Sequence, residues 1–214
     1  MKVAMFLYDK MTALDFVGPF QVFSIMPGVE VLTVAREAGP VDDDSGLQLL
    51  NAKYSIYDVP QADVLVLPGG LDNTHVQNDP EIIPWIRKID QGTKWTTSVC
   101  TGSLILGAAG LLKGVRATTH WAMLDALEGF GATPVKERVV HDGKYLSGGG
   151  VTAGIDMALT LLAKEFGDES AQAMQLAIEY NPQPPFDTGS PEKAPQNIQD
   201  MVMQFFAGDQ AAVN

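Results

Sequence analysis

Two short runs of nearly uninterrupted apolar residues constrain the fold of this chain most strongly. They are Val3–Tyr8 and Asp63–Leu67, and the second is ended directly by Pro68-Gly69-Gly70. A strand with one face in water alternates apolar and polar residues, whereas a strand buried on both faces reads as a continuous apolar run. The two runs therefore predict central strands of a sheet that is covered on both faces.

Strand-like and helix-like segments alternate along the chain, and glycines such as Gly28, Gly92 and Gly167 mark helix ends. The predicted strands are Val3–Tyr8, Val29–Arg36, Asp63–Leu67, Trp95–Val99, Arg116–Thr119, Val135–His141 and Lys144–Ser147. The predicted helices are Asp15–Met26, Pro80–Asp90, Thr101–Leu112, Trp121–Glu128, Val151–Phe166 and Asp168–Tyr180. This alternation predicts a flavodoxin-like three-layer α/β sandwich with a mostly parallel sheet. We expect one domain over residues 1–214, with a proline-rich arm over about 181–195 and a final short helix over Asn197–Phe206.

The only cysteine of the chain, Cys100, lies where a predicted strand meets a predicted helix. A nucleophile on such a sharp strand-to-helix turn is held out into an active site. The free N–H groups at a helix N-terminus also favour the thiolate. The alternative is a small buried hydrophobic residue, which is a common role of an unpaired cysteine. The turn favours the nucleophile and predicts a cysteine nucleophile elbow.

A cysteine nucleophile needs hydrogen-bond donors that stabilise developing negative charge. The backbone N–H of Thr101 directly follows Cys100, where such a donor is expected. Gly70, at the end of another predicted strand, could offer a second N–H because glycine allows close backbone approach. The alternative for Gly70 is a plain tight turn. Ligands of parallel sheets bind at the carboxyl ends of the strands, where both residues are expected.

Asp15 lies between Leu14 and Phe16 at the start of the first predicted helix. A carboxylate at this position can cap the helix, and position alone favours that role. The side chain could instead face Cys100, where apolar surroundings would raise its pKa and make it a general acid. A thiol and a carboxyl group that close would hold one proton between them and titrate as a unit.

His120 follows a predicted strand and opens a predicted helix, so it is a possible neighbour of Cys100. A histidine beside a cysteine is a common way to activate the thiol, but a single histidine at a helix start is more often structural. The three histidines and one cysteine lack the spacing of a zinc site. Gly148-Gly149-Gly150 does not meet the spacing of a dinucleotide-binding loop. We therefore expect neither a metal nor a cofactor.

The charge of the chain disfavours several classes of partner. Lys and Arg number 14 against 26 Asp and Glu, which gives a net charge of −12. Phosphate backbones and anionic membranes repel such a chain, so we expect no nucleic-acid and no membrane partner. The apolar stretch at the N-terminus is too short for the core of a signal peptide. Because one cysteine can form no intrachain disulfide, a reducing compartment fits, and we expect a cytoplasmic protein.

Several motifs make the chain resemble the ThiJ/PfpI family, which belongs to the class I glutamine-amidotransferase-like superfamily. The family motifs are Leu14–Pro19, Leu67–Gly70 and Val99–Gly102. Three further motifs, which resemble the isonitrile hydratase branch of the family, are Ala117–Trp121, Ser147–Asp156 and Glu179–Phe186. Family proteases place a histidine where this chain has Thr101, and many relatives carry a glutamate where it has Asp15. Aspartate and threonine at these positions are similar to the hydratase branch, so the resemblance implies a catalytic Asp15 and a homodimer.

The resemblance implies hydration of an isonitrile, R–N≡C, to an N-substituted formamide without a cofactor. Cys100 would attack the terminal carbon to form a covalent thioimidate, and Asp15 would donate a proton and later activate water. Thr101 would position the reacting group through its hydroxyl, and the N–H groups of Thr101 and Gly70 would hold developing charge. Three other functions stay open: a glyoxalase-like hydratase of reactive aldehydes, a cysteine-based redox or stress sensor, and a ligand-binding module. The last is the least expected because the chain is acidic.

Overall fold

The computed structural model describes residues 1–48 and 50–212, and the burial of side chains through residue 208. The chain forms two compact units, Met1–Glu179 and Tyr180–Asn214. Each unit is described by itself below. The first unit contains every residue that the sequence predicts for the site.

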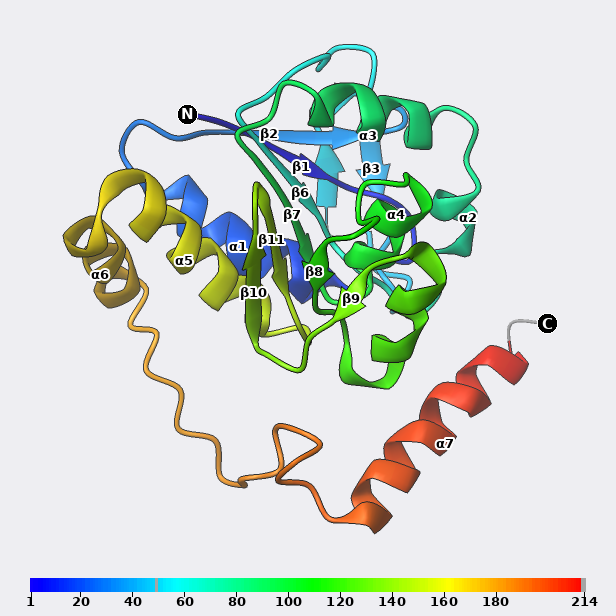
Figure 1. Cartoon of the computed structure of the whole chain (residues 1–214). Helices are drawn as coiled ribbons and strands as arrows, with labels where there is room; N and C mark the ends of the chain where they lie inside the picture. The colour runs from blue at the N-terminus through cyan, green and yellow to red at the C-terminus, as the bar shows by residue number, and fades with distance from the viewer. Residues whose placement is uncertain (49, 213–214) are drawn as a thin grey trace. The chain divides into compact units, whose positions relative to one another are not determined.

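The first unit is built around a sheet of seven strands in the described part of the chain (Figure 1). The strands lie in the order β10-β11-β7-β6-β1-β2-β5, and all neighbours are parallel except β10 and β11. Their bounds are β1 Lys2–Phe6, β2 Glu30–Ala35, β5 Tyr54–Ser55, β6 Val64–Leu67, β7 Trp95–Val99, β10 Val139–Asp142 and β11 Tyr145–Gly148. In the five central strands the chain runs in the order 2-1-3-4-5, which is the flavodoxin-like order. The predicted fold class is therefore confirmed.

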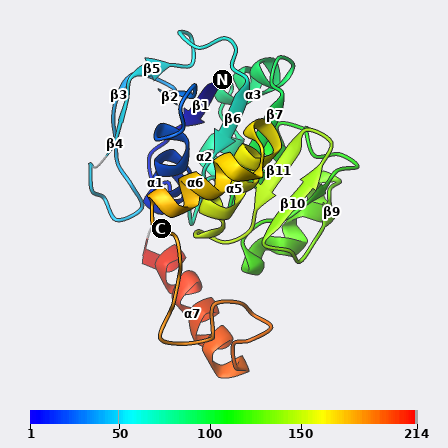
Figure 2. The same ribbon diagram turned by 90° about the vertical axis from the view of Figure 1, so that its left-hand side faces the viewer.

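The two apolar runs form the centre of the sheet. Strands β1 and β6 lie side by side, with Ala4 of β1 paired to Leu32 of β2 and to Leu65 of β6. Every residue of β6 is fully buried. Helices α1 (Ala13–Ser24) and α5 (Ala153–Phe166) cover one face, and α3 (Ile82–Asp90) and α4 (Gly102–Ala108) cover the other (Figures 1 and 2). Burial on both faces explains why neither run alternates.

Several elements differ from the prediction. Helix α4 ends at Ala108 rather than Leu112, because Gly110 adopts a φ of 76° and turns the chain. The predicted helix from Trp121 is a 3₁₀ helix, η1 (Trp121–Phe130), and the left-handed Gly131 ends it. The remaining short elements, most of which the sequence did not predict, are β3 Gly39–Val41, β4 Leu50–Ala52, α2 Thr74–Gln77, β8 Arg116–Ala117, β9 Thr133–Pro134 and α6 Asp168–Ala177.

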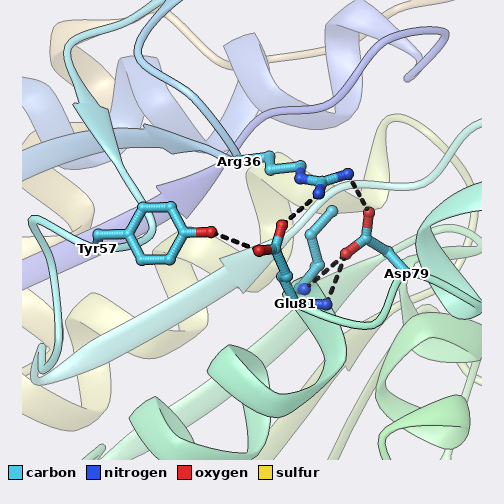
Figure 3. Close-up of polar contacts among 5 residues, drawn as sticks. Arg36, Tyr57, Asp79 and Glu81 are labelled. Atoms are coloured by element: carbon cyan, nitrogen blue, oxygen red, sulfur yellow. Dashed lines mark hydrogen bonds and ion pairs between the residues drawn. The ribbon is translucent and has the colours of Figure 1, made fainter.

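A polar cluster of Arg36, Tyr57, Asp79 and Glu81 joins three loops beside the sheet (Figure 3). Arg36 directly follows β2, and its guanidinium group forms ion pairs with Asp79, at 3.0 Å, and with Glu81. The Tyr57 hydroxyl donates a hydrogen bond to Glu81 at 2.8 Å. Asp79 also accepts hydrogen bonds from the N–H groups of Glu81 and Ile82, at 2.8 and 2.9 Å. Asp79 therefore caps the start of α3 as well as holding Arg36.

The second unit begins with the proline-rich segment and continues into α7 (Gln196–Ala212), which is longer than the predicted final helix. Within it, the Gln199 side chain donates to the carbonyl groups of Pro191 and Ala194, both at 2.9 Å. Lys193 and Asp187 form an exposed ion pair at 2.6 Å. Across residues 1–48 and 50–212, no helix has the length and apolar character needed to cross a membrane.

Candidate active site

Cys100 lies on a strained strand-to-helix turn. Strand β7 ends at Val99, α4 begins at Gly102, and Cys100 between them adopts a φ of 55°. This left-handed conformation is uncommon for a residue with a side chain. The Cys100 N–H donates to the Gly148 carbonyl at 3.0 Å, and the Thr119 hydroxyl donates to the Cys100 carbonyl at 3.0 Å. Surrounding hydrogen bonds of this kind hold a strained residue in place, so the elbow is built into the fold.

Asp15 is the third residue of α1 and is completely buried. Its Oδ2 accepts a hydrogen bond at 2.8 Å from the N–H of Gly69, which follows the far end of β6. The N-cap position of α1 belongs to Thr12, so the capping alternative for Asp15 is wrong. Among the described residues, no nitrogen or oxygen donates to the other carboxyl oxygen, Oδ1. The carboxyl group thus sits under the turn, beside the thiol of Cys100, with which it interacts.

Burial controls the protonation of both groups. Burial raises the pKa of Asp15 from 3.8 to about 7, although hydrogen bonds with Gly69 and Cys100 counteract it. Burial and the nearby Asp15 carboxylate raise the pKa of Cys100 well above its ordinary value, and hydrogen bonds from Thr101 offset only part of this. Burial thus opposes the effect expected from the helix N-terminus, which favours the thiolate. Helix α4 has only seven residues, and desolvation of a buried charge outweighs its terminal N–H groups.

Thr101 and Gly70 are joined by two hydrogen bonds. The Thr101 hydroxyl accepts from the Gly70 N–H at 3.0 Å and donates to the Gly70 carbonyl at 2.7 Å. The prediction required a free Gly70 N–H, and in this structure that donor is occupied. At the preceding position, a Cβ atom on Gly69 would lie 2.5 Å from the Thr101 nitrogen and 2.9 Å from Asp15 Oδ2. The turn after β6 therefore does more than end the strand. Only glycine at position 69 allows this turn to approach Thr101 and Asp15 so closely.

His120 is half-buried at the start of η1, next to Thr119, which bonds to the elbow. Its Nδ1 accepts a hydrogen bond at 3.3 Å from the Ala122 N–H. Burial lowers the pKa of His120, which favours the neutral imidazole. His120 thus lies on a segment beside the elbow and caps η1, and its part in the chemistry stays a prediction.

Sequence reasoning missed two buried residues of the site, Tyr8 and Asn73. Tyr8 lies just after β1, and its hydroxyl donates a hydrogen bond to the Pro68 carbonyl at 3.1 Å. Burial raises the pKa of Tyr8, and the charges of Asp15 and Cys100 raise it further, so the phenol is neutral and close to both. Asn73 is 3% exposed and donates to the Thr101 carbonyl at 2.9 Å. The available signal was position, since both follow the carboxyl ends of central parallel strands.

This arrangement can perform covalent chemistry in which a proton leaves a thiol and returns to the substrate. The carboxyl group with a pKa of about 7 is suited to carry that proton near neutral pH. Among the residues that the structure describes, no group of three or more His, Cys, Asp or Glu side chains could hold a metal ion.

A buried cysteine on an elbow, paired with a carboxyl group from the first helix of a flavodoxin-like sheet, defines a class of cysteine-dependent α/β proteins. The DJ-1/PfpI family matches residues 1–164, and the chain belongs to this family. An isonitrile hydratase of Pseudomonas putida is 46% identical over 200 residues, which cover 94% of this chain and 87% of that protein. The crystal structure of a ThiJ/PfpI family protein from Pseudomonas syringae has a TM-score of 0.93 and 40% identity, covering 97% of this chain and 86% of that one. The transcriptional regulator CdhR of Pseudomonas aeruginosa is 30% identical over 168 residues, 71% of this chain but only 49% of the regulator.

Proposed function

We propose that this protein is an isonitrile hydratase that forms an N-substituted formamide from an isonitrile and water. The observation that carries the proposal is the buried pair of Asp15 and Cys100, in a chain 46% identical over 94% of its length to the isonitrile hydratase of Pseudomonas putida. A pair that holds a proton in an apolar site fits a reaction whose first step adds a thiol to a neutral substrate.

In the proposed first step, the Cys100 sulfur bonds to the terminal carbon of R–N≡C while its proton passes to Asp15, which is in its ionised form at the start of the step. Asp15 delivers that proton to the same carbon, which gives the neutral thioimidate R–N=CH–S–Cys. A raised pKa of the thiol supports this order, because the proton that sulfur loses is the one that carbon gains. Charge separation is brief, as a buried site requires.

In the second step, Asp15 activates a water molecule that adds to the thioimidate carbon. The tetrahedral intermediate R–NH–CH(OH)–S–Cys then collapses to R–NH–CHO and restores the Cys100 thiol. Thr101 positions the reacting group and its N–H holds developing charge, while the Gly70 N–H supports this role through the Thr101 hydroxyl to which it donates. His120 is a neighbouring residue without an assigned step. No cofactor enters this scheme.

The test is formamide production from an alkyl isonitrile by the purified protein and its variants. Cys100→Ala is expected to abolish turnover, because the covalent step needs the sulfur. Asp15→Asn is expected to lower kcat by at least the roughly 10²-fold typical of general acid–base groups. Asp63→Asn is the matched control, since Asp63 binds the Lys2 N–H at the opposite end of β6. Turnover by Cys100→Ala would contradict the covalent scheme, and a near-normal Asp15→Asn would contradict the role of Asp15.

The other functions are separated by parallel measurements. Product assays with 2-oxoaldehydes test the glyoxalase-like hydratase. Burial and the raised pKa of Cys100 argue against a redox sensor, which needs an exposed thiolate; mass spectrometry after mild peroxide treatment tests it. The homodimer and the cytoplasmic location are further parts of the proposal, and sedimentation and cell fractionation test them.

A further inference from the structure

The Thr101 hydroxyl makes hydrogen bonds with two neighbouring residues of the site, Gly70 and Asn73. This oxygen accepts from the Gly70 N–H at 3.0 Å and from Asn73 Nδ2 at 3.3 Å. A hydroxyl has two lone pairs and one proton, so both lone pairs are used. The one proton of the hydroxyl is donated to the Gly70 carbonyl at 2.7 Å. Gly70 and Asn73 together therefore fix the orientation of the Thr101 hydroxyl, in the residue that directly follows Cys100.

Asn73 is itself held in one orientation. Its Nδ2 donates to the Thr101 carbonyl at 2.9 Å, and its Oδ1 accepts from Gln77 Nε2 at 2.7 Å. A flipped amide would place a carbonyl against the Thr101 carbonyl, so the contacts define which end is the nitrogen. The residue is 3% exposed, so water does not replace these bonds at low cost.

We propose that Asn73 is a positioning residue of the reaction, which acts through Thr101 by keeping its hydroxyl and its backbone in place beside Cys100. The proposal rests on the proposed function for its kinetic readout. Loss of the Asn73 amide removes one hydrogen bond from the Thr101 hydroxyl and one from the Thr101 carbonyl, so both groups can move away from their positions beside Cys100. The thiolate formed during the reaction loses stabilisation as a result.

The experiment uses the full chain and two readouts: turnover of an alkyl isonitrile, and the rate of Cys100 alkylation by iodoacetamide from about pH 7 to 9.5. Because the chain has one cysteine, alkylation reports on that thiol alone. Asn73→Ala is expected to lower kcat roughly tenfold with KM within about threefold, since the deleted amide orients a group that is still present. The alkylation rate is expected to fall at each pH, because the thiolate is less stabilised.

Asn78→Ala is the matched control, because Asn78 is an exposed asparagine whose side chain donates to the nearby Thr74 carbonyl, at 2.8 Å. It is expected to leave both readouts unchanged. Gln77→Ala removes the donor that orients the Asn73 amide and is expected to give a smaller loss of the same kind. Gln77 is only partly buried, so this variant keeps the proposal testable if Asn73→Ala does not fold.

A double-mutant cycle with Thr101→Val decides whether Asn73 acts through Thr101. Asn73→Ala is expected to cost little further activity in that background, whereas independent effects would multiply. Wild-type rates in Asn73→Ala, or full multiplication of the two losses, would overturn the proposal. If the wild-type protein fails to hydrate isonitriles, the proposed function fails, while the alkylation rates still decide the role of Asn73.

Discussion

At the scale of single residues, the site depends on one thiol and one carboxyl group that share a buried environment. Cys100 is 6% exposed and Asp15 is completely buried. Burial makes either charge costly, and it is the main reason that the pKa of each group is raised. Burial therefore favours the protonated form of each group over its charged form. The close approach of these groups depends on a residue without a side chain, Gly69.

Gly69→Ala is expected to lower the proposed hydratase activity at least tenfold. The added methyl group would lie 2.5 Å from the Thr101 nitrogen and 2.9 Å from Asp15 Oδ2, so the elbow or the carboxyl group must shift. Overpacking of this kind costs about 1–3 kcal/mol of folding free energy. Gly129→Ala is the control, because an added Cβ there meets nothing within 4 Å. Kinetics and urea unfolding of both variants measure the effect, and equal behaviour of the two would show that the contact is not tight.

At the scale of elements, short loops carry the site and a polar cluster ties neighbouring loops together. Asp79 makes two kinds of contact in this cluster (Figure 3). One carboxyl oxygen caps α3, and the other pairs with Arg36, which follows β2. The Arg36 side chain is 50% exposed, so the ion pair itself contributes little. The capping bonds are the larger part of the contribution of Asp79 to stability.

Asp79→Ala is expected to lower the free energy of unfolding by about 1–2 kcal/mol, as loss of a helix cap does. Tyr57→Phe, which removes only the exposed bond to Glu81 at 2.8 Å, is expected to cost less than about 0.5 kcal/mol. Urea unfolding followed by circular dichroism compares the two. A loss in Asp79→Ala no larger than that in Tyr57→Phe would contradict the capping role.

At the scale of the whole molecule, the buried carboxyl group couples stability to pH. The folded protein holds the Asp15 proton up to a pKa of about 7, whereas the unfolded chain releases it near 3.8. A group whose pKa rises on folding contributes its full stability below the unfolded pKa and loses it as the pH rises through the folded pKa. Relative to a chain without this group, the protein therefore becomes less stable between about pH 4 and pH 7.

The comparison of wild type with Asp15→Asn isolates this effect, because other carboxylates contribute equally to both proteins. Since the pI is about 4.5, the useful range begins near pH 5. From about pH 5 to 7.5, the wild type is expected to lose about 2–3 kcal/mol of unfolding free energy relative to Asp15→Asn. Urea unfolding at several pH values measures the difference. A constant difference would show that Asp15 is not protonated at neutral pH in the folded protein.

Local sequence patterns were enough to predict the main strands and helices along the chain, the central place of Val3–Tyr8 and Asp63–Leu67, and the elbow at Cys100. These follow from local patterns: continuous apolar runs, glycine stops, and a strand that meets a helix at one residue. The ends of elements were less well predicted. Helix α4, for example, ends before the left-handed Gly110, whereas the predicted helix ran on to Leu112.

Three features could be found only in the folded structure: the burial that raises the pKa of Cys100, the contact of Asp15 with Gly69, and the contact of Asn73 with Thr101. Asp15 and Gly69 are 54 residues apart in the chain, so no local pattern reports their contact. A pKa depends on how much water and charge surround a group, and that is set by packing from segments distant in sequence. The helix N-terminus was visible in the sequence, but the burial that outweighs it was not.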